Sequence, residues 1–378
     1  MKIFKKAILP IGFQASGISC GIKKSGKPDL ALFYSNAPAK AACLFTANKI
    51  PAAPIVLNKE RLKKSKSFQA IIANSGNANA FTGVNGLKDS RYTAQALAKS
   101  LGIKKEYVLV ASTGIIGKKL PVEKIKNFLT PLIKNLSRHG INPAQKAIMT
   151  TDTFAKEVTA QFKLGQKTVT ICGIAKGAGM IAPNMATMLC FLFTDAAITQ
   201  GALKDALKLA VENSFNCITV DGCMSTNDSV MLLANGQAQN RLIEAGGDLV
   251  LFALAMNKVC MELAKMVVRD GEGANKFIRI RVLGAKNFGQ AKTFALSIAN
   301  SNLFKTAIYG ENPNYGRIVS AVGACGIKVK EMDLKIKVSP LAKKDVFVDV
   351  CVGKGAAQAV VYTSDLTPEY IKINAEYN

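Results

Sequence analysis

The sequence predicts a mixed α/β (α+β) protein built of packed layers. Hydrophobic residues make up 49% of the 378 residues and charged residues 20%, a composition typical of globular proteins. Strand-like and helical runs alternate without the strict strand–helix order of a parallel sheet, and no internal repeat is visible. A chain of this length easily buries a large core. The clearest change in character falls between Ala186 and Thr187, which divides the chain into 1–186 and 187–378.

Apolar periodicity and the glycines and prolines that interrupt it place the individual elements. Alternating runs that begin at Lys156 and Lys167 flank Gly165, which predicts a β-hairpin. Pro121 opens an amphipathic helix at the first turn, where its missing N–H costs nothing. In chain order we expect a strand within 67–80, a helix at 89–102, a strand at 107–113, a helix at 121–136, the hairpin, a strand after Thr187, helices at 198–215 and 250–268, a strand at 276–284 and a C-terminal β-meander of three strands.

Cysteine and histidine usage excludes several kinds of active site. The nine cysteines are scattered, odd in number and never paired as CxxC, which indicates reduced thiols in a cytoplasmic protein rather than disulfides or a zinc site. His139 is the only histidine, so a Cys-His or Ser-His-Asp enzyme would have to use it. We therefore expect no metal and no resident cofactor.

Charge and hydropathy limit the expected partners. The net charge of +25 comes from dispersed lysines, and no RNP motif, zinc finger or basic zipper accompanies it, so we favour a solvated lysine-rich surface over nucleic-acid binding. Such a field still attracts small anionic substrates. No apolar stretch approaches eighteen residues, so we expect no membrane span. The basic N-terminus, interrupted by Pro10 and Gly12, is interpreted as a mature start.

A threonine, Thr187, begins a strand-like apolar run directly after the segment KGAGMIAPNMA at 176–186. If the Ala186–Thr187 bond were cut, the new α-amine, with a pKa near about 8, could accept the hydroxyl proton. The upstream glycines would let the chain bend enough for the hydroxyl to attack its own preceding carbonyl in an N-to-O acyl shift. The competing interpretation is an ordinary strand threonine, which this position alone favours.

Two further stretches carry groups suited to catalysis or binding. In ASTGIIG at 111–117, a strand ends in Thr113 and Gly114. The Thr113 hydroxyl and the Gly114 backbone N–H could stabilise an oxyanion. The competing interpretation is an ordinary glycine turn after a strand, which has the same sequence pattern. RDGEGAN at 269–275 holds Glu272 between glycines, which suits binding of a substrate ammonium group or a solvated acid at a helix end.

A loop with two acids and several hydroxyls, TVDGCMSTND at 219–228, allows two interpretations. Acidic and hydroxyl oxygens could hold a divalent cation. Capping of a following helix by Ser225 or Thr226 is the more common use of such residues, and we prefer it.

The order of these motifs resembles the ornithine acetyltransferase family, also called bifunctional glutamate N-acetyltransferases. The resemblance runs from residue 12 to the last residues, and KGAGMIAP..ATML is highly specific to the family. It changes Thr187 from a weak candidate nucleophile into a strong one. In order, the motifs are STGIIG, MTTDT (149–153), KGAGMIAPNMATML, VDGCMSTND, GEGA, NPNYGR and INAEY (373–377).

The resemblance implies an N-terminal-nucleophile-like α/β sandwich that cleaves itself into an α chain ending at Ala186 and a β chain beginning at Thr187. It implies acetyl transfer from N-acetylornithine to glutamate in arginine biosynthesis, through an acetyl-threonine intermediate. Acetyl-CoA is a second donor in some members, and the implied assembly is an α2β2 heterotetramer.

The resemblance also assigns roles to individual residues. Thr187 is the nucleophile and also a substrate-binding residue, and Thr113 with Gly114 forms the oxyanion hole. The implied substrate-binding positions are Lys176, Glu272, Asn374 and one hydroxyl of MTTDT, for which we prefer Thr153 and keep Thr151 as the second choice.

Three positions depart from the family pattern. Cys223 stands where an acid is common, and Tyr315 replaces the usual tryptophan of NPNWGR. The family usually ends with one further Ser or Thr that touches substrate, whereas this sequence stops at Asn378, so either that residue is missing or the contact is absent. Two competing functions stay open: an N-terminal-nucleophile aminopeptidase or amidase that passes the acyl group to water, and a basic RNA-binding protein.

Overall fold

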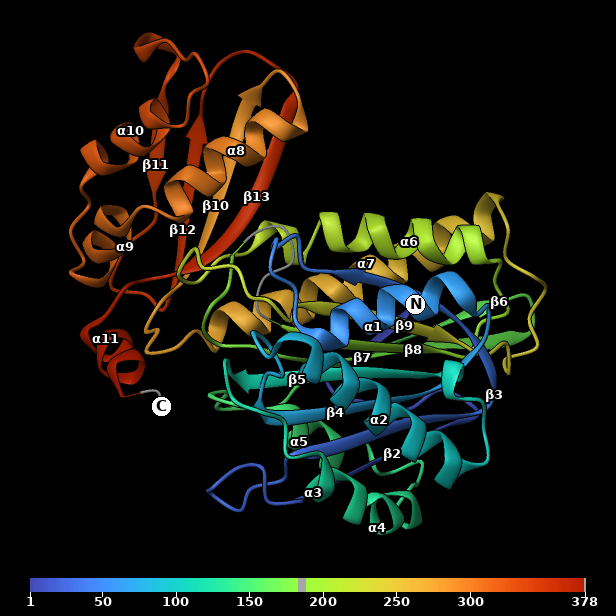
Figure 1. Ribbon diagram of the computed structural model, residues 1–378. Helices are drawn as coiled ribbons and strands as arrows, with labels where there is room; N and C mark the ends of the chain where they lie inside the picture. Colours follow the sequence, from blue (N-terminus) through green and yellow to red (C-terminus); the bar gives the residue numbers. More distant parts are fainter. Residues whose placement is uncertain (183–187, 377–378) are drawn as a thin grey trace. The chain divides into compact units, whose positions relative to one another are not determined.

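The computed structural model describes residues 1–182 and 188–376 (Figure 1). The chain forms two compact units, each described here by itself. The first unit comprises Met1–Gly177, Thr187–Ser214 and Met224–Leu263, and the second comprises Ala178–Ala186, Phe215–Cys223 and Ala264–Asn378.

A nine-stranded sheet forms the centre of the first unit, in the order β1-β6-β7-β8-β9-β3-β4-β5 with β2 on β3. β3 is shared, because its first part pairs with β2 and β4 and its second part pairs with β9. The strands are β1 (Lys2–Phe4), β2 (Phe13–Ile18), β3 (Leu30–Phe45), β4 (Phe68–Asn77), β5 (Val108–Ile115), β6 (Lys156–Leu164), β7 (Lys167–Lys176), β8 (Leu189–Thr194) and β9 (Ser229–Ala234).

The two ends of this sheet pack face to face through one apolar core. Phe33 of β3 contacts Phe191 and Phe193 of β8, with ring centroids 4.9 and 5.3 Å apart. Aromatic pairs at these distances add to the free energy gained from burial alone. Strand residues alternate between this inner core and the outer faces, as the period of two requires.

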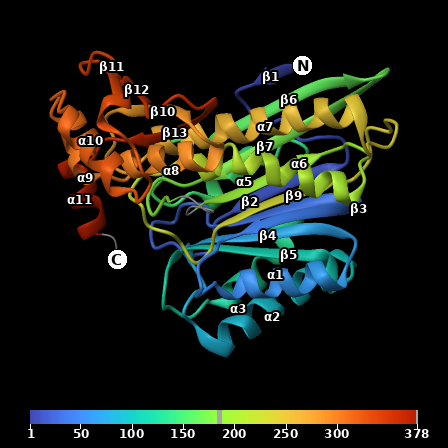
Figure 2. The same ribbon diagram turned by 90° about the horizontal axis from the view of Figure 1, so that it is seen from above.

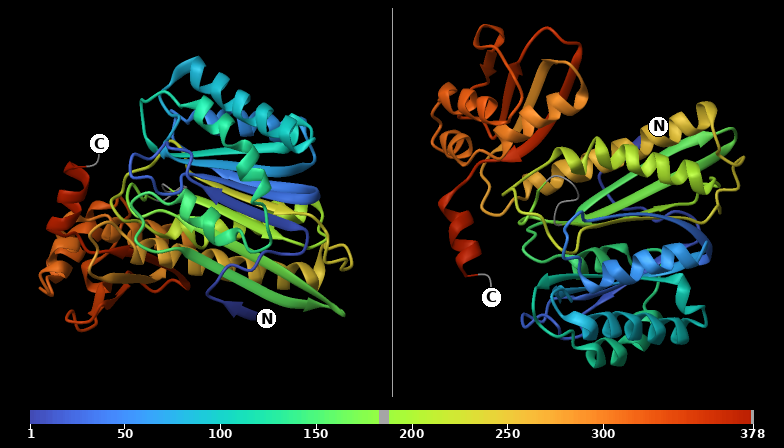
Figure 3. Two further views of the ribbon diagram at one scale, coloured as in Figure 1. Left: turned by 90° about the horizontal axis from the view of Figure 1, so that it is seen from below. Right: turned by 45° about the horizontal axis from the view of Figure 1, so that its top comes forward.

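Helices cover both outer faces of the first unit, which gives an α/β/β/α sandwich (Figures 2 and 3). α1 and α2 lie on the side of β4 and β5, whereas α6 and α7 lie on the side of β7–β9. The helices of this unit are α1 (Ala53–Lys64), α2 (Gly83–Leu101), α3 (Val122–Asn127), α4 (Leu129–Lys134), α5 (Ile141–Ile148), α6 (Gln200–Glu212) and the part of α7 (Gly246–Arg269) up to Leu263, with a 3-10 turn at Lys105–Tyr107; the 3-10 turn at Phe215–Cys217 belongs to the second unit.

One glycine explains how closely α7 approaches the sheet. A Cβ at Gly173 of β7 would lie 2.8 Å from side-chain atoms of Leu192 and of Val259 and Leu263 on α7, so a larger residue there would force these side chains to shift. Although α7 is long and rich in apolar residues, none of the helices in the described part of the chain has the length and apolarity needed to cross a bilayer.

The second unit has its own four-stranded sheet, in the order β11-β12-β10-β13, and its own apolar core (Figure 1). α8, α9 and α10 contribute their apolar faces to that core. The elements are β10 (Phe277–Ala285), α8 (Phe288–Ala299), α9 (Asn302–Tyr309), α10 (Tyr315–Ala324), a 3-10 turn (Glu331–Asp333), β11 (Lys335–Val338), β12 (Asp345–Cys351), β13 (Ala357–Ser364) and α11 (Pro368–Ala375).

The layered α/β fold is confirmed, and so is the hairpin of β6 and β7 around Gly165, which has φ of +58°. Two expectations were wrong. The helix at 121–136 is two helices that meet at Phe128, because Pro131 in the second lacks an N–H and its ring clashes with a carbonyl one turn back. The three C-terminal strands form no simple meander, because β10 inserts between β12 and β13 and pairs in parallel with β12. Local periodicity carries no information about such a long-range partner.

Candidate active site

Thr113 and Gly114 lie near the end of β5, beside the parallel strand β4. In the strand register, Gly114 pairs with Gly76 of β4. The φ of Gly114 is +129°, and a Cβ there would lie 2.4 Å from the carbonyl carbon of Gly76. The two backbones therefore approach more closely than any side chain permits, and only glycine satisfies both constraints.

Side-chain amides fix the peptide groups next to Thr113. The Asn227 Nδ2 donates to the carbonyl oxygens of Ser112 and Ala78, at 2.8 and 2.6 Å. The Ser112 hydroxyl donates to Asn74 Oδ1 at 2.7 Å. Because these polar side chains are buried and hydrogen-bonded, the 112–113 peptide is oriented before any ligand arrives.

The ammonium group of Lys176 lies against the Thr113 hydroxyl. Lys176 Nζ donates to Thr113 Oγ1 at 3.3 Å, and the two residues are only 4% and 5% exposed. A hydroxyl that accepts from a cation keeps its own hydrogen for donation to a further acceptor. This arrangement is suited to stabilising negative charge that develops on a substrate oxygen, because donor and cation are fixed in a site with little water.

A second lysine adds positive charge to the same part of the first unit. Lys23 Nζ donates to the carbonyl oxygens of Pro28 and Met149, at 2.8 and 2.7 Å. Burial lowers the pKa of Lys23 to about 8, a shift that Asp29 opposes and the Lys176 charge reinforces. Lys23 and Lys176 together offer positive charge to an anionic group such as a carboxylate, although Asp29 and Asp152 offset part of that charge.

Asp152, the acid of MTTDT, anchors the loop before β6. Its Oδ1 accepts from Lys156 Nζ at 2.6 Å and from the Gly177 amide at 2.7 Å, and its Oδ2 accepts from the Thr150 amide at 2.9 Å. Burial acts to raise the pKa of Asp152, but Lys176 and Lys156 hold it well below its usual range. The carboxylate thus joins the MTTDT loop to the start of the KGAG segment.

Two hydrogen bonds hold the backbone at the start of β8, which runs parallel to β9. Asp228 Oδ1 accepts from the Met188 amide at 3.1 Å, and the Met188 carbonyl accepts from the Ser229 amide at 3.0 Å. Asp228 is fully buried, which raises its pKa well above the ordinary value. Met188 directly follows the candidate nucleophile in the sequence, so these bonds fix the chain immediately after it.

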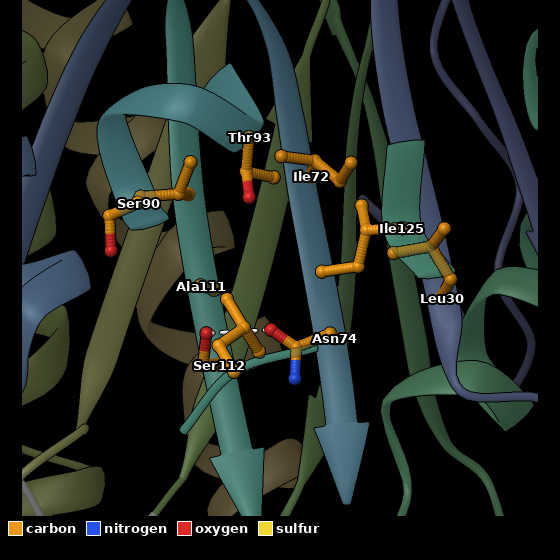
Figure 4. Close-up of a pocket in the computed structure, with 10 residues that line it drawn as sticks. Leu30, Ile72, Asn74, Ser90, Thr93, Ala111, Ser112 and Ile125 are labelled. Carbon is orange, nitrogen blue, oxygen red and sulfur yellow. Dashed lines mark hydrogen bonds between the residues drawn. The ribbon is translucent and has the colours of Figure 1, made fainter. Parts of the chain in front are cut away.

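A small cavity lies beside the Asn74–Ser112 hydrogen bond (Figure 4). Ser90 and Thr93 of α2 face it, and the buried Thr93 hydroxyl has no hydrogen-bond partner among the described residues. Its volume of about 10 Å³ is the space of a single water molecule. It can hold a structural water but no substrate.

The second unit brings together the other two predicted binding residues, Glu272 and Asn374. Glu272 lies in the turn after α7, and its Oε2 accepts from Asn374 Nδ2 of α11 at 2.9 Å. A Cβ at Gly179 would lie 2.1–2.5 Å from the Glu272 carboxyl atoms, so the carboxylate rests directly on that glycine. Glu272 is half-buried and Asn374 is exposed, which leaves the pair accessible to an ammonium group.

The remaining predicted residues have different outcomes. Ala186 and Thr187 lie outside the described residues. Thr151 is half-buried and Thr153 exposed, on either side of the buried Asp152 side chain. The helix-capping role expected for Ser225 or Thr226 was wrong, because the chain continues into β9, and Ser225 Oγ accepts from the Asn227 amide at 3.0 Å instead.

Sequence reasoning missed three residues that organise these clusters: Asp152, Asn227 and Lys23. The first two stand inside motifs that were recognised, so an acid or amide buried next to small residues was the available signal. Lys23 lies in an ordinary lysine-rich stretch, and nothing local distinguishes it from the solvated lysines around it.

Comparison with known proteins identifies the family. The family model described as "ArgJ family" matches residues 14–378. A protein of Caldanaerobacter subterraneus subsp. tengcongensis named "Arginine biosynthesis bifunctional protein ArgJ" is 44% identical over 397 residues, which cover 98% of each chain. A protein of Geobacter sulfurreducens with the same name is 43% identical over 388 residues, covering 97% of this chain and 98% of the relative.

Among solved structures, ornithine acetyltransferase from Mycobacterium tuberculosis complexed with ornithine is 35% identical, with a TM-score of 0.45, and the match covers 48% of this chain and 97% of that chain. The near-complete match to the family model and the identity over almost the full length agree with the motifs and with the residues brought together in each unit. The chain described here belongs to the ArgJ family.

Proposed function

We propose that this protein is an acyltransferase of arginine biosynthesis that transfers the acetyl group of N-acetylornithine to glutamate. One observation carries the proposal: the buried Thr113 hydroxyl, beside a backbone position that only glycine can occupy, accepts a hydrogen bond from the Lys176 ammonium. Fixed donors of this kind are what acyl transfer needs, because the carbonyl oxygen becomes negative as the nucleophile attacks.

The nucleophile in this proposal is Thr187, freed by cleavage of the Ala186–Thr187 bond. In the precursor, the Thr187 hydroxyl attacks the carbonyl carbon of Ala186, the peptide C–N bond breaks as the nitrogen takes the hydroxyl proton, and water then hydrolyses the resulting ester. The products are an α chain that ends at Ala186 and a β chain that begins with a free amine. That amine, with an ordinary pKa near about 8, becomes the base for each later turnover.

Transfer then follows a double-displacement course. The Thr187 oxygen attacks the acetyl carbonyl of N-acetylornithine while its proton passes to the α-amine, and Thr113 and Gly114 donate to the oxyanion. Ornithine leaves with the proton, and the acetyl group remains as a threonine ester. The glutamate amine attacks that ester, which forms N-acetylglutamate and restores the threonine.

The binding residues divide by charge. Lys176, with Lys23 behind it, provides the potential for a substrate carboxylate, and a hydroxyl of the MTTDT loop, Thr153 or Thr151, provides a neutral contact. Glu272, held by Asn374, accepts the side-chain ammonium of ornithine. We also propose acetyl-CoA as a second acetyl donor, in keeping with the word "bifunctional" in the names of the relatives. An α2β2 assembly of the two chains is proposed from the family resemblance alone.

Mass measurement under denaturing conditions, followed by transfer assays, tests the proposal. Wild-type protein should give two chains whose masses match 1–186 and 187–378, and Thr187→Ala should give one uncut chain and no ester intermediate. Thr194→Ala is a matched control, because it removes the hydroxyl of a threonine at the end of β8 that takes no part in the proposed chemistry.

The donor assay separates transfer from hydrolysis. Release of ornithine from N-acetylornithine should depend on glutamate and yield N-acetylglutamate in equal amount. Release of acetate at the same rate without glutamate would support the amidase alternative, and cleavage of the Thr187→Ala chain would disprove the role of Thr187.

A further inference from the structure

A second carboxylate in the second unit, Asp221, has no role in the chemistry proposed above. It lies in the VDGC segment, and it accepts hydrogen bonds from four donors on three different segments. Its oxygens accept from the amides of Met180, Ile181 and Cys223, at 2.6, 2.9 and 3.0 Å, and from the Tyr370 hydroxyl at 3.3 Å. A carboxylate that saturates its acceptor sites in this way is fixed, and it fixes the segments that donate to it.

The first of these segments carries Gly179, on which the Glu272 carboxylate rests. Met180 has a φ of +58°, a left-handed conformation that is unfavourable for a residue other than glycine. The Asp221 bonds to two consecutive amides hold that conformation, and the Ile181 carbonyl in turn accepts from the Val220 amide at 2.9 Å. The position of Gly179 therefore depends on the VDGC segment.

The second segment is α11, which carries Asn374. Tyr370 lies one helical turn before Asn374. The Asn374 side-chain Nδ2, which donates to Glu272, also donates to the Tyr370 carbonyl oxygen at 3.0 Å. The start of α11 is tied to the Glu272 turn as well, since the Thr367 hydroxyl donates to the Gly273 carbonyl at 2.7 Å. Through Met180 and Tyr370, Asp221 thus holds the two segments that contact the Glu272 carboxylate. These are the segment that contains Gly179 and helix α11, which carries Asn374.

We propose that Asp221 is a positioning residue for the Glu272–Asn374 pair, which binds the side-chain ammonium of the donor. It contacts neither Glu272 nor Asn374 itself, but it sets the separation between the glycine below the carboxylate and the helix that carries the amide. This inference rests on the proposed function, because the ammonium belongs to the proposed donor.

The test is a split between KM and kcat for N-acetylornithine in the assembled, cleaved protein at saturating glutamate. Asp221→Asn keeps the shape but replaces one acceptor oxygen with a donor, and we expect KM to rise about tenfold with little change in kcat, since a misplaced binding group weakens ground-state and transition-state binding alike. Tyr370→Phe removes only the link to α11 and should raise KM by a smaller factor. Loss of folded protein would lower the apparent kcat and leave KM unchanged.

Two matched controls and one double variant sharpen the result. Asp345→Asn is the control for Asp221→Asn, because it also replaces a carboxylate of the second unit, one that accepts two hydrogen bonds from Arg269. Tyr92→Phe is the control for Tyr370→Phe, because it also removes a tyrosine hydroxyl that donates to a carboxylate. Both should keep the wild-type KM. If Asp221 acts through Glu272, Asp221→Asn should raise KM no further in a Glu272→Gln background.

The outcomes separate this inference from the proposed function. An unchanged KM in Asp221→Asn, or a full additional rise in the double variant, would overturn the positioning role while leaving acetyl transfer intact. A wild-type protein that releases no ornithine from N-acetylornithine would instead contradict the proposed function.

Discussion

The Thr113 cluster of the first unit and the Glu272–Asn374 pair of the second unit are built in opposite ways. Thr113 and Lys176 lie on neighbouring ends of strands, are about 5% exposed or less, and are surrounded by side-chain amides that fix their peptide groups. Glu272 lies in a turn and Asn374 on the last helix, where both remain accessible.

This difference matches the demands of the two tasks. Stabilising a developing oxyanion requires donors that are already in place and shielded from water, because their effect is weakened by a high dielectric. Recognition of an ammonium group, the role proposed for the Glu272–Asn374 pair, requires entry and exit of a hydrated ligand, and the accessible position of the pair suits that role. Substitutions in the first cluster should therefore act on kcat and folding, and those in the second on KM.

The largest effect is expected from Gly114→Ala. The added Cβ would lie 2.4 Å from the backbone of Gly76 at a φ of +129°, so β4 and β5 must move apart. We expect a loss of roughly 2–3 kcal/mol in the free energy of unfolding and a loss on the order of 100-fold in kcat. Urea denaturation and steady-state transfer assays measure the two effects.

Gly117→Ala is the matched control for this prediction. Gly117 also has a positive φ, +81°, but a Cβ there would meet no atom within 4 Å. It should show the conformational cost alone, about 1 kcal/mol, and keep most of the transfer activity. Equal losses in both variants would show that the close approach of the strands is unimportant.

An intermediate effect is expected from Glu272→Gln. The variant keeps the Asn374 contact geometry but loses the negative charge, and a charge-assisted hydrogen bond is worth about 1.5–3 kcal/mol, so KM for N-acetylornithine should rise roughly 10- to 100-fold. The kcat should change little. Glu60→Gln, which removes an exposed partner of Arg91, is the control with no expected effect. A fall in kcat at constant KM would place Glu272 in the chemical step and end the contrast drawn above.

The smallest effect is expected from Asp228→Asn, measured as stability against pH. Burial raises the folded-state pKa of Asp228, so its contribution to stability is complete below about pH 4, the unfolded pKa, and is lost as pH rises through the folded value. Asparagine does not titrate. The variant should therefore gain stability relative to wild type between about pH 4 and neutral pH, by on the order of 1 kcal/mol.

Denaturation in the Thr187→Ala background, where we expect a single chain, measures this difference. Asp345→Asn provides a control of opposite sign, because the Arg269 hydrogen bonds lower the pKa of Asp345 and its contribution is present only above the unfolded pKa. That variant should lose stability over the same pH range. A pH-independent difference for Asp228→Asn would mean that this carboxyl ionises normally despite its burial.

Much of the local structure was predictable because it depends on nearest neighbours. Period-two runs around Gly165 became the β6–β7 hairpin, and the apolar run at 250–268 became most of α7. The prediction of a single helix at 121–136 was wrong. A local rule could have corrected it, because a proline such as Pro131 inside a helix has a high free-energy cost. Thr113, Gly114, Glu272 and Asn374 were identified from motif order; the structure places Thr113 and Gly114 together on β5 and joins Glu272 to Asn374 by a hydrogen bond, while their roles stay predictions.

By itself, the sequence determined the layered class of the fold, most of the helices and strands, and the family, because periodicity, turn residues and motif order are properties of the linear sequence. Only the tertiary structure decided that β10 separates β12 from β13, that Gly76 and Gly114 touch, and that Lys23, Asn227 and Asp221 bond to backbone groups far away in the chain. These features depend on contacts between residues distant in the chain, and the free energy of a buried charge or amide depends on the partners that folding brings to it.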